Sequence, residues 1–156
     1  KNFVLYGFGE FGLNNKVYNY TLAFGARTGN NPKRNDLSTR LSGLTPNTPE
    51  YIEVANQYAK TDGRYVDNFL EDASYFAIRE LSLSYDFTDL LNDFNLLGYV
   101  KYVTVGVSAR NVLRITKYSG PDFEINSFGA RSIAQGTDFL TLQTPRTVNF
   151  WVRLGF

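Results

Sequence analysis

Residues 147–156, TVNFWVRLGF, decide the fold, because apolar and mostly polar side chains alternate along this stretch. One set of alternate positions is apolar and comprises Val148, Phe150, Val152, Leu154 and Phe156. The other set comprises Asn149, Trp151, Arg153 and Gly155. Successive side chains of a strand point to opposite sides, so the pattern is typical of the closing strand of a transmembrane β-barrel. A soluble antiparallel sheet packed on one side gives the same alternation.

Arg153 indicates which face meets the lipid. A slip of one residue would turn Arg153 toward hydrocarbon, at a cost of about 2–4 kcal/mol near the bilayer midplane. We therefore expect Phe150, Val152, Leu154 and Phe156 to face outward.

Composition excludes several classes of protein. The 156 residues suit one domain, but the chain starts with Lys1 inside a strand-like pattern and contains no methionine, so we expect a fragment of a longer protein. No run approaches 18 apolar residues, which excludes a transmembrane helix. A net charge of +1 without a basic stripe gives no reason to expect nucleic acid.

Catalytic chemistry has little support in the sequence. Cysteine and histidine are absent, which removes disulfides, zinc-thiolate sites, thiol catalysis and the usual general base. The segment GFGEFG matches G-x-G-x-x-G, but a strand-like segment follows it instead of the helix that a dinucleotide needs. The acidic neighbours Glu71 and Asp72, like Asp122 and Glu124, fit solvated loops better than a glycosidase pair. We predict no enzyme, no cofactor and no metal site.

Five strands are expected in total. Residues 2–11 and 16–25 are predicted as a hairpin joined by GLNN. The others are the segment SYFAIRELSLSYDF (74–87), the segment around 103–110 and the closing strand. In the first strand we expect the even positions, Val4, Tyr6 and Phe8, to face lipid, with Glu10 near the periplasmic edge.

Two long polar segments, near 26–73 and 114–144, separate these strands. Within the first, PEYIEVANQYAK predicts a short amphipathic helix. Thr48 is its N-cap, Pro49 its first helical residue and Glu50 lies in its first turn. Ile52, Ala55 and Tyr58 or Ala59 would line one side.

Loop lengths predict an orientation. If the chain ends on the periplasmic side, the connections near 12–15 and 88–97 are periplasmic and the two long segments are extracellular. Short turns inside and long loops outside are the asymmetry of outer-membrane barrels. Five strands cannot close a barrel, so at least three more are needed. The predicted fold class is all-β, an antiparallel transmembrane β-barrel of which this chain supplies about the last five strands.

Three stretches within residues 67–156 together match the pattern of one family. The first includes Asp72, Ser74, Tyr75, Leu83, Ser84, Tyr85 and Asp86. The second, the family's loop motif, comprises Asn111, Thr116, Lys117, Tyr118, Gly120, Asp122 and Glu124. The third is the C-terminal LQTPRTVNFWVRLGF. In this order they resemble the C-terminal part of SusC/RagA-type TonB-dependent outer-membrane transporters of Bacteroidota. Two departures are the displaced Arg79 and Phe123, which stands where proline is usual.

The resemblance implies a barrel of about 22 strands with an N-terminal plug that lies outside this chain. It implies import of oligosaccharides or peptides together with a SusD-like lipoprotein, with energy from TonB acting on a missing N-terminal part. It also implies that the alternating C-terminal residues ending at Phe156 are the barrel-assembly signal. We predict that the lumen-facing residues are Glu80, Arg110, Asn149, Trp151 and Arg153.

An alternative is a soluble surface β-sandwich that binds glycan or protein through exposed aromatic residues. A sandwich would bury the faces of Tyr18, Leu22, Leu83 and Val105 in a shared core. A barrel would expose these faces to lipid.

Overall fold

The computed structural model describes residues 2–93, 100–129, 131 and 133–156. They divide into two compact units. The first, the sheet unit, comprises Lys1–Leu13, Tyr75–Thr116 and Thr144–Phe156. The second, the loop unit, comprises Asn14–Ser74 and Lys117–Gln143.

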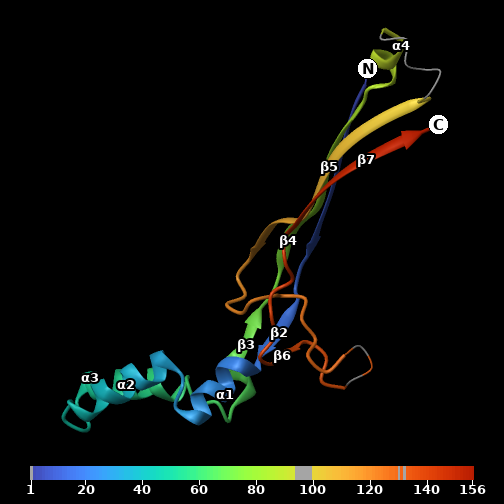
Figure 1. Cartoon of the computed structure of the whole chain (residues 1–156). Coiled ribbons are helices and arrows are strands. Elements are labelled where there is room, and N and C mark those ends of the chain that lie inside the picture. The colour runs from blue at the N-terminus through green and yellow to red at the C-terminus, as the bar shows by residue number, and fades with distance from the viewer. Residues whose placement is uncertain (1, 94–99, 130, 132) are drawn as a thin grey trace. The chain divides into compact units, whose positions relative to one another are not determined.

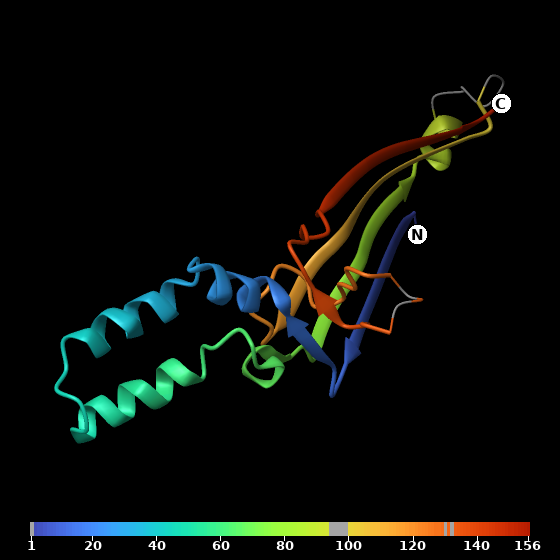
Figure 2. The ribbon, with the colours of Figure 1, turned by 90° about the horizontal axis from the view of Figure 1, so that it is seen from below.

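The sheet unit is one four-stranded antiparallel sheet in the order β1-β4-β5-β7 (Figure 1). Its strands are β1 (Phe3–Gly12), β4 (Tyr75–Asp86), β5 (Tyr102–Thr116) and β7 (Thr147–Gly155). Figure 2 shows them side by side as blue, green, yellow and red ribbons. A short helix, α4 (Thr88–Asp93), follows β4. The predicted strands 74–87, 103–110 and 148–156 are therefore confirmed.

The register places the apolar positions of neighbouring strands on one face. Leu83 of β4 pairs with Val107 of β5, and Val107 pairs with Phe150 of β7. On the other face Ser82 pairs with Ser108, and Ser108 pairs with Asn149. Because paired residues point to the same side, the alternation in β4, β5 and β7 produces an apolar face and a polar face across these three strands.

The predicted orientation of the first strand is wrong. Leu5 pairs with Leu83, so the odd positions of β1 share the apolar face. The even positions Val4, Tyr6 and Phe8 lie on the polar face. Nearly every residue from Phe3 to Phe8 is large and apolar, so β1 itself does not distinguish its faces, and the neighbouring strand β4 decides.

A β-bulge interrupts the sheet between Ile78 and Glu80, where Arg79 has no register partner. Beyond the bulge the faces are maintained, since Phe76 pairs with Phe11 of β1 and with Ile115 of β5. Bulges insert one residue and re-aim a side chain. Here the bulge places two successive charged residues of β4 on the polar face.

The predicted hairpin over 2–11 and 16–25 is also wrong. β1 pairs with β4, and the second segment divides into β2 (Lys16–Asn19) and the helix α1 (Tyr20–Thr28). Asn19 caps this helix, because its side-chain oxygen accepts a hydrogen bond from the Leu22 N–H at 3.0 Å. Gly29 ends it in the left-handed conformation, with φ of 80°.

The positions of the connections change with the hairpin. Gly12 pairs with Tyr75, and Tyr75 pairs with Thr116, so both long segments leave the same end of the sheet. Residues 12–15 are not a turn at the opposite end, and Glu10, which pairs with Ala77, lies near the end of the long segments. Of the short connection predicted near 88–97, residues 94–97 lie outside the described part of the chain.

The loop unit shows that the two long polar segments have regular structure. It contains the helices α1, α2 (Pro32–Ser42) and α3 (Pro49–Ala59) and the short η1 (Val66–Phe69). Its small sheet has the order β3-β2-β6, with β3 at Leu70–Asp72 and β6 at Thr137–Asp138. Ala23, Ala26 and Phe69 form a buried cluster. None of the described helices has the length and apolarity needed to cross a membrane.

Helix α3 begins as the sequence predicts. The Thr48 hydroxyl accepts a hydrogen bond from the Tyr51 N–H at 3.2 Å, and Pro49 and Glu50 occupy the first turn. The side that packs inward differs in part from the predicted one, because Val54 is buried whereas Ile52 is 51% exposed. The Arg34 guanidinium of α2 lies 4.0 Å from the centre of the Tyr58 ring, which joins the two helices.

Candidate functional site

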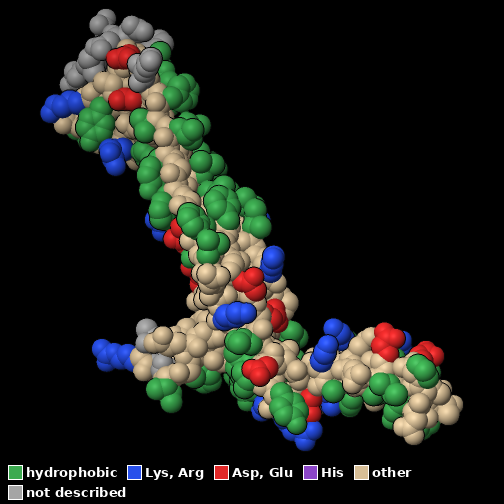
Figure 3. Space-filling view, turned by 180° about the vertical axis from the view of Figure 1, so that it is seen from behind, with side chains coloured by type: hydrophobic (Ala, Val, Ile, Leu, Met, Phe, Trp, Pro, Cys, Tyr) green, Lys and Arg blue, Asp and Glu red, His purple; other side chains and the backbone are tan. Residues whose placement is uncertain are grey.

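The apolar face of the sheet is exposed along all four strands. Figure 3 shows hydrophobic side chains along this unit. Phe150 is 83% exposed and Leu5 is 71% exposed, whereas Leu83 and Val105 are 42% and 40% exposed. Soluble monomers rarely expose an apolar patch of this extent, which marks a surface for lipid or for another protein. The sandwich alternative expects Leu83 and Val105 to be buried, and in this chain they are not. Tyr18 and Leu22, which both alternatives placed on the same kind of strand face, lie instead in β2 and α1 of the loop unit.

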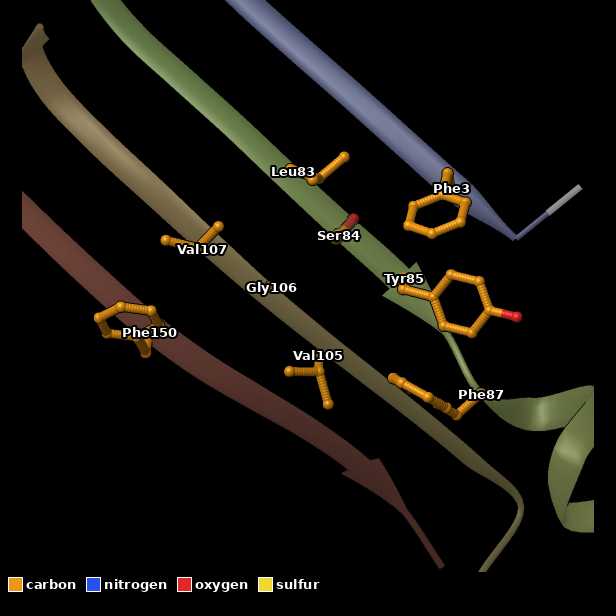
Figure 4. A pocket seen from close by; sticks show the side chains of 9 residues that line it. All are labelled: Phe3, Leu83, Ser84, Tyr85, Phe87, Val105, Gly106, Val107 and Phe150. Atoms are coloured by element: carbon orange, nitrogen blue, oxygen red, sulfur yellow. The ribbon is translucent and has the colours of Figure 1, made fainter.

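A shallow apolar hollow of about 290 Å³ lies on this face (Figure 4). The rings of Phe3, Tyr85 and Phe87 stand at one end, with centroids 4.5 Å apart between Phe3 and Tyr85 and again between Tyr85 and Phe87. Phe150 lies on β7, beside its register partner Val107 of β5. Edge-to-face aromatic contacts of this kind contribute about 0.5–1.5 kcal/mol each. They fix a group of aromatic side chains at the end of the sheet that carries the C-terminus.

The polar face carries an ion pair at the bulge. The Arg79 guanidinium of β4 contacts the Glu10 carboxylate of β1. The Arg79 side chain is 17% exposed and that of Glu10 is 35% exposed. A pair with so little solvent contact is screened less than a surface pair. It ties the edge strand β1 to β4, and sequence analysis did not identify it because the residues are far apart in the chain.

The predicted lumen-facing residues Glu80 and Arg110 lie opposite each other on β4 and β5. Arg110 Nε is 3.9 Å from Glu80 Oε2, and the Arg110 side chain is 66% exposed. Such an open pair contributes little to stability. The Arg110 side chain is therefore largely open to solvent on the polar face.

The other three predicted residues lie on β7. Asn149 pairs with Ser108, and the Trp151 ring lies against the backbone of Gly106. The Arg153 guanidinium is 5.7 Å from the centre of the Trp151 ring, a cation–π contact. All five predicted residues thus share one face, in two groups. Their role toward a solute stays a prediction.

The predicted assembly-signal residues lie on the apolar face or follow its last strand. Phe150, Val152 and Leu154 are exposed there, and Phe156 follows β7 and is 77% exposed. Exposed alternating side chains at a chain end are compatible with recognition by another protein. That role also stays a prediction.

The family loop motif serves mainly to shape the loop unit. Tyr118 is 6% exposed, and its hydroxyl donates to the fully buried Asp138 at 2.6 Å. Burial, and next the hydrogen bond to Asp138, raise the pKa of Tyr118. The Thr141 hydroxyl contacts the other carboxylate oxygen of Asp138. Gly120 lies against the Tyr118 ring and has no room for a side chain.

The remaining residues of the motif also make structural contacts. Asp122 is 3% exposed and accepts a hydrogen bond from the Glu124 N–H at 3.2 Å. Asn111 and Thr116 lie in β5; Asn111 has a φ of 54° and donates to the Pro145 carbonyl at 2.9 Å. These contacts hold chain turns, and none of them forms a catalytic constellation.

The loop unit contains a hydrogen-bonded network that the sequence did not predict. Glu71 Oε1 accepts from Asn19 Nδ2 at 3.0 Å and from the Ser119 hydroxyl at 2.8 Å, and Glu71 Oε2 accepts from the Ser119 N–H at 2.8 Å. It joins β2, β3 and the segment after β5. Among the described residues no group of three or more acidic, histidine or cysteine side chains is arranged to hold a metal ion.

Solved structures of known proteins resemble this chain in fold. No family model and no curated protein sequence matches the chain. A solved structure described as the RagAB peptide transporter matches 100% of this chain at 20% identity, with a TM-score of 0.64. The RagAB peptide importer in the "open-open" state matches 56% of it at 26% identity, with a TM-score of 0.45. The chain spans only 16% and 9% of those chains, respectively. The full-length match shows that this chain is similar in fold to a segment of a RagAB transporter chain.

Proposed function

We propose that this chain is part of the wall and outer loops of an outer-membrane, TonB-dependent importer of the SusC/RagA type. Its four long strands contribute to a larger β-barrel, and residues 1–156 form its C-terminal segment. The cargo is a peptide or an oligosaccharide. The chain itself catalyses no reaction.

The observation that carries the proposal is the separation of an apolar face and a polar face over β4, β5 and β7. The apolar face exposes Leu5, Val105 and Phe150, whereas the polar face carries two ion pairs that involve Glu10 and Glu80. A barrel wall between lipid and a hydrated lumen requires this separation. The full-length likeness in fold to a RagAB transporter supports the same interpretation.

The loops suit the same role. Both long segments leave one end of the sheet, as extracellular loops of an outer-membrane barrel do. We propose that the segments near 26–73 and 114–144 are extracellular and contact a SusD-like lipoprotein. TonB would act on a part of the protein outside these residues.

Cysteine labelling in intact cells tests the proposal directly, because the chain has no cysteine of its own. Val105→Cys and Ser108→Cys differ by three positions on β5 and lie on opposite faces. We expect a membrane-impermeant maleimide, once admitted to the periplasm and lumen, to label Ser108→Cys only. A lipid-soluble maleimide should label Val105→Cys.

The two alternatives give different patterns. In a β-sandwich Val105→Cys is buried in a core, so neither reagent labels it before denaturation. Recovery of the protein in the soluble fraction without detergent would also contradict the proposed function. Ser84→Cys on β4 is the matched control for the polar face, since Ser84 pairs with Gly106.

A further inference from the structure

A cavity of about 390 Å³ lies in the loop unit, where the start of α2, the end of α3, η1 and β3 come together. Its lining includes three charged side chains, Lys33, Lys60 and Glu71, beside the apolar Leu22 and Phe69. The volume lies in the range of about 300–1,000 Å³ that small-molecule sites occupy. The barrel wall proposed above does not use this cavity.

The two lysines supply positive charge. Lys33 lies in the first turn of α2 and Lys60 caps the end of α3. Neither forms an ion pair with any residue that the structure describes. The positive end of the α2 dipole adds to the charge of Lys33. Two unpaired ammonium groups at one cavity favour a carboxylate on the ligand.

Asn31 adds an unused donor. It is 8% exposed, and its side-chain oxygen is occupied as the cap of α2, where it accepts from the Arg34 N–H at 3.1 Å. Its side-chain nitrogen donates to no described residue, although Asn31 lines the cavity. This nitrogen is therefore free to donate a hydrogen bond to an acceptor in the cavity.

Glu71 supplies negative charge. Three hydrogen bonds from Asn19 and Ser119 hold its carboxylate in place, and none of these donors is charged. A carboxylate has about four acceptor positions, so one remains. Glu71 pairs with no cation among the described residues. This carboxylate favours an ammonium group on the ligand.

We propose that the cavity binds a short peptide with free termini. Its carboxylate interacts with Lys33 and Lys60 and with the Asn31 amide, and its ammonium group interacts with Glu71. A neutral oligosaccharide offers neither charge. The inference rests on the proposed import function and selects peptides from the two cargo classes named there.

Calorimetric titration of the purified complete protein with trialanine tests this site. The double variant Lys33→Gln/Lys60→Gln should bind trialanine about tenfold more weakly or worse, as expected for loss of charged contacts. Lys117→Gln is the matched control, since Lys117 is exposed in the same unit but does not line the cavity. Glu71→Gln should weaken binding of trialanine and leave binding of N-acetyl-trialanine unchanged.

Three results would overturn the site. They are equal affinity of the double variant and the unaltered protein, equal affinity for trialanine and its acetylated amide, and equally tight binding of inorganic phosphate. Fractionation of the cells that produce each variant separates the two proposals. Normal recovery in the outer membrane with unchanged binding rejects the cavity only, whereas recovery as a soluble protein rejects the import function.

Discussion

The Trp151 ring covers Gly106 so closely that a Cβ added to the glycine would lie 2.3 Å from a ring carbon. The same relationship joins Tyr102 to Gly155 and Tyr75 to Gly12. All three pairs cross neighbouring strands on the polar face. Aromatic rings that cover glycines in this way support the register of curved sheets.

Gly106→Ala should therefore destabilise the sheet by about 1–3 kcal/mol, the usual effect of overpacking. The reason is that Trp151 must leave its position against the backbone. Gly7→Ala is the control, because its added Cβ would meet Leu81 at an ordinary 3.7 Å. Thermal unfolding of both variants measures the difference. Equal transition temperatures would show that the ring has room to move.

Arginine substitutions distinguish the two faces of β5. Val105→Arg on the apolar face should reduce the amount of assembled protein in the outer membrane, because a lipid-facing arginine costs about 2–4 kcal/mol at the bilayer midplane. Ser108→Arg on the polar face should be tolerated. Quantitative blotting of membrane fractions measures both. Similar amounts of the two variants would contradict the assignment of the faces.

The two ion pairs of the polar face should differ in strength. Glu10→Gln removes the carboxylate that the mostly buried Arg79 guanidinium contacts and should reduce stability by about 1–3 kcal/mol. Arg110→Gln should change stability by less than about 1 kcal/mol, because that pair is open to solvent. Denaturant unfolding of both variants gives the comparison. A larger effect of Arg110→Gln would mean that exposure does not govern these pairs.

Tyr118 should give the loop unit a dependence on alkaline pH. The folded state keeps the phenol protonated because its pKa is raised, while in the unfolded chain it ionises near pH 10. The stabilisation of the folded state by the protonated Tyr118 hydroxyl is therefore fully present below about pH 10 and is lost as the pH rises beyond that value.

Tyr118→Phe should remove this dependence and cost about 1–3 kcal/mol at neutral pH, since Asp138 loses a donor. Unfolding measured at about pH 8 and about pH 11 checks both effects. Tyr65→Phe, at an exposed tyrosine, serves as the control. A loss of stability at high pH that is the same with and without the Tyr118 hydroxyl would reject this assignment.

Sequence patterns predicted the strands whose two faces differ chemically. In β4 the alternation of Leu81 and Leu83 with Ser82 and Ser84 fixes both the strand and its orientation. In β1 large apolar residues occupy successive positions, so the faces depend on pairing with β4. The bulge at Arg79 also depends on long-range pairing, and no local signal indicates it.

Residues 16–25 show why alternation can mislead. Tyr20, Leu22 and Phe24 alternate with Thr21 and Ala23 as in a strand, yet they form α1. Tyr20 and Phe24 are also four residues apart and therefore lie on one side of a helix, with ring centroids 6.3 Å apart. Local spacing fits both structures, and the Asn19 cap together with burial of Ala23 favours the helix.

The candidate sites were only partly predictable. Local capping chemistry at Thr48, Pro49 and Glu50 predicts the start of α3. Asn31 and Pro32 give a similar signal for α2, but the polar composition of that helix hides its amphipathic pattern. The contacts of Glu71 with Asn19 and Ser119, and of Tyr118 with Asp138, join distant parts of the chain. Such contacts follow from the tertiary fold and carry no signature in the sequence.

The strand order has a consequence for handling this polypeptide. β1 and β7 are the outermost strands, and each is hydrogen-bonded along one side only within the described residues. Each therefore presents a long row of unpaired amide and carbonyl groups beside an apolar surface. Such a row is a template for the addition of further strands. Produced in isolation, copies of the chain should join edge to edge into aggregates unless other strands occupy both borders first.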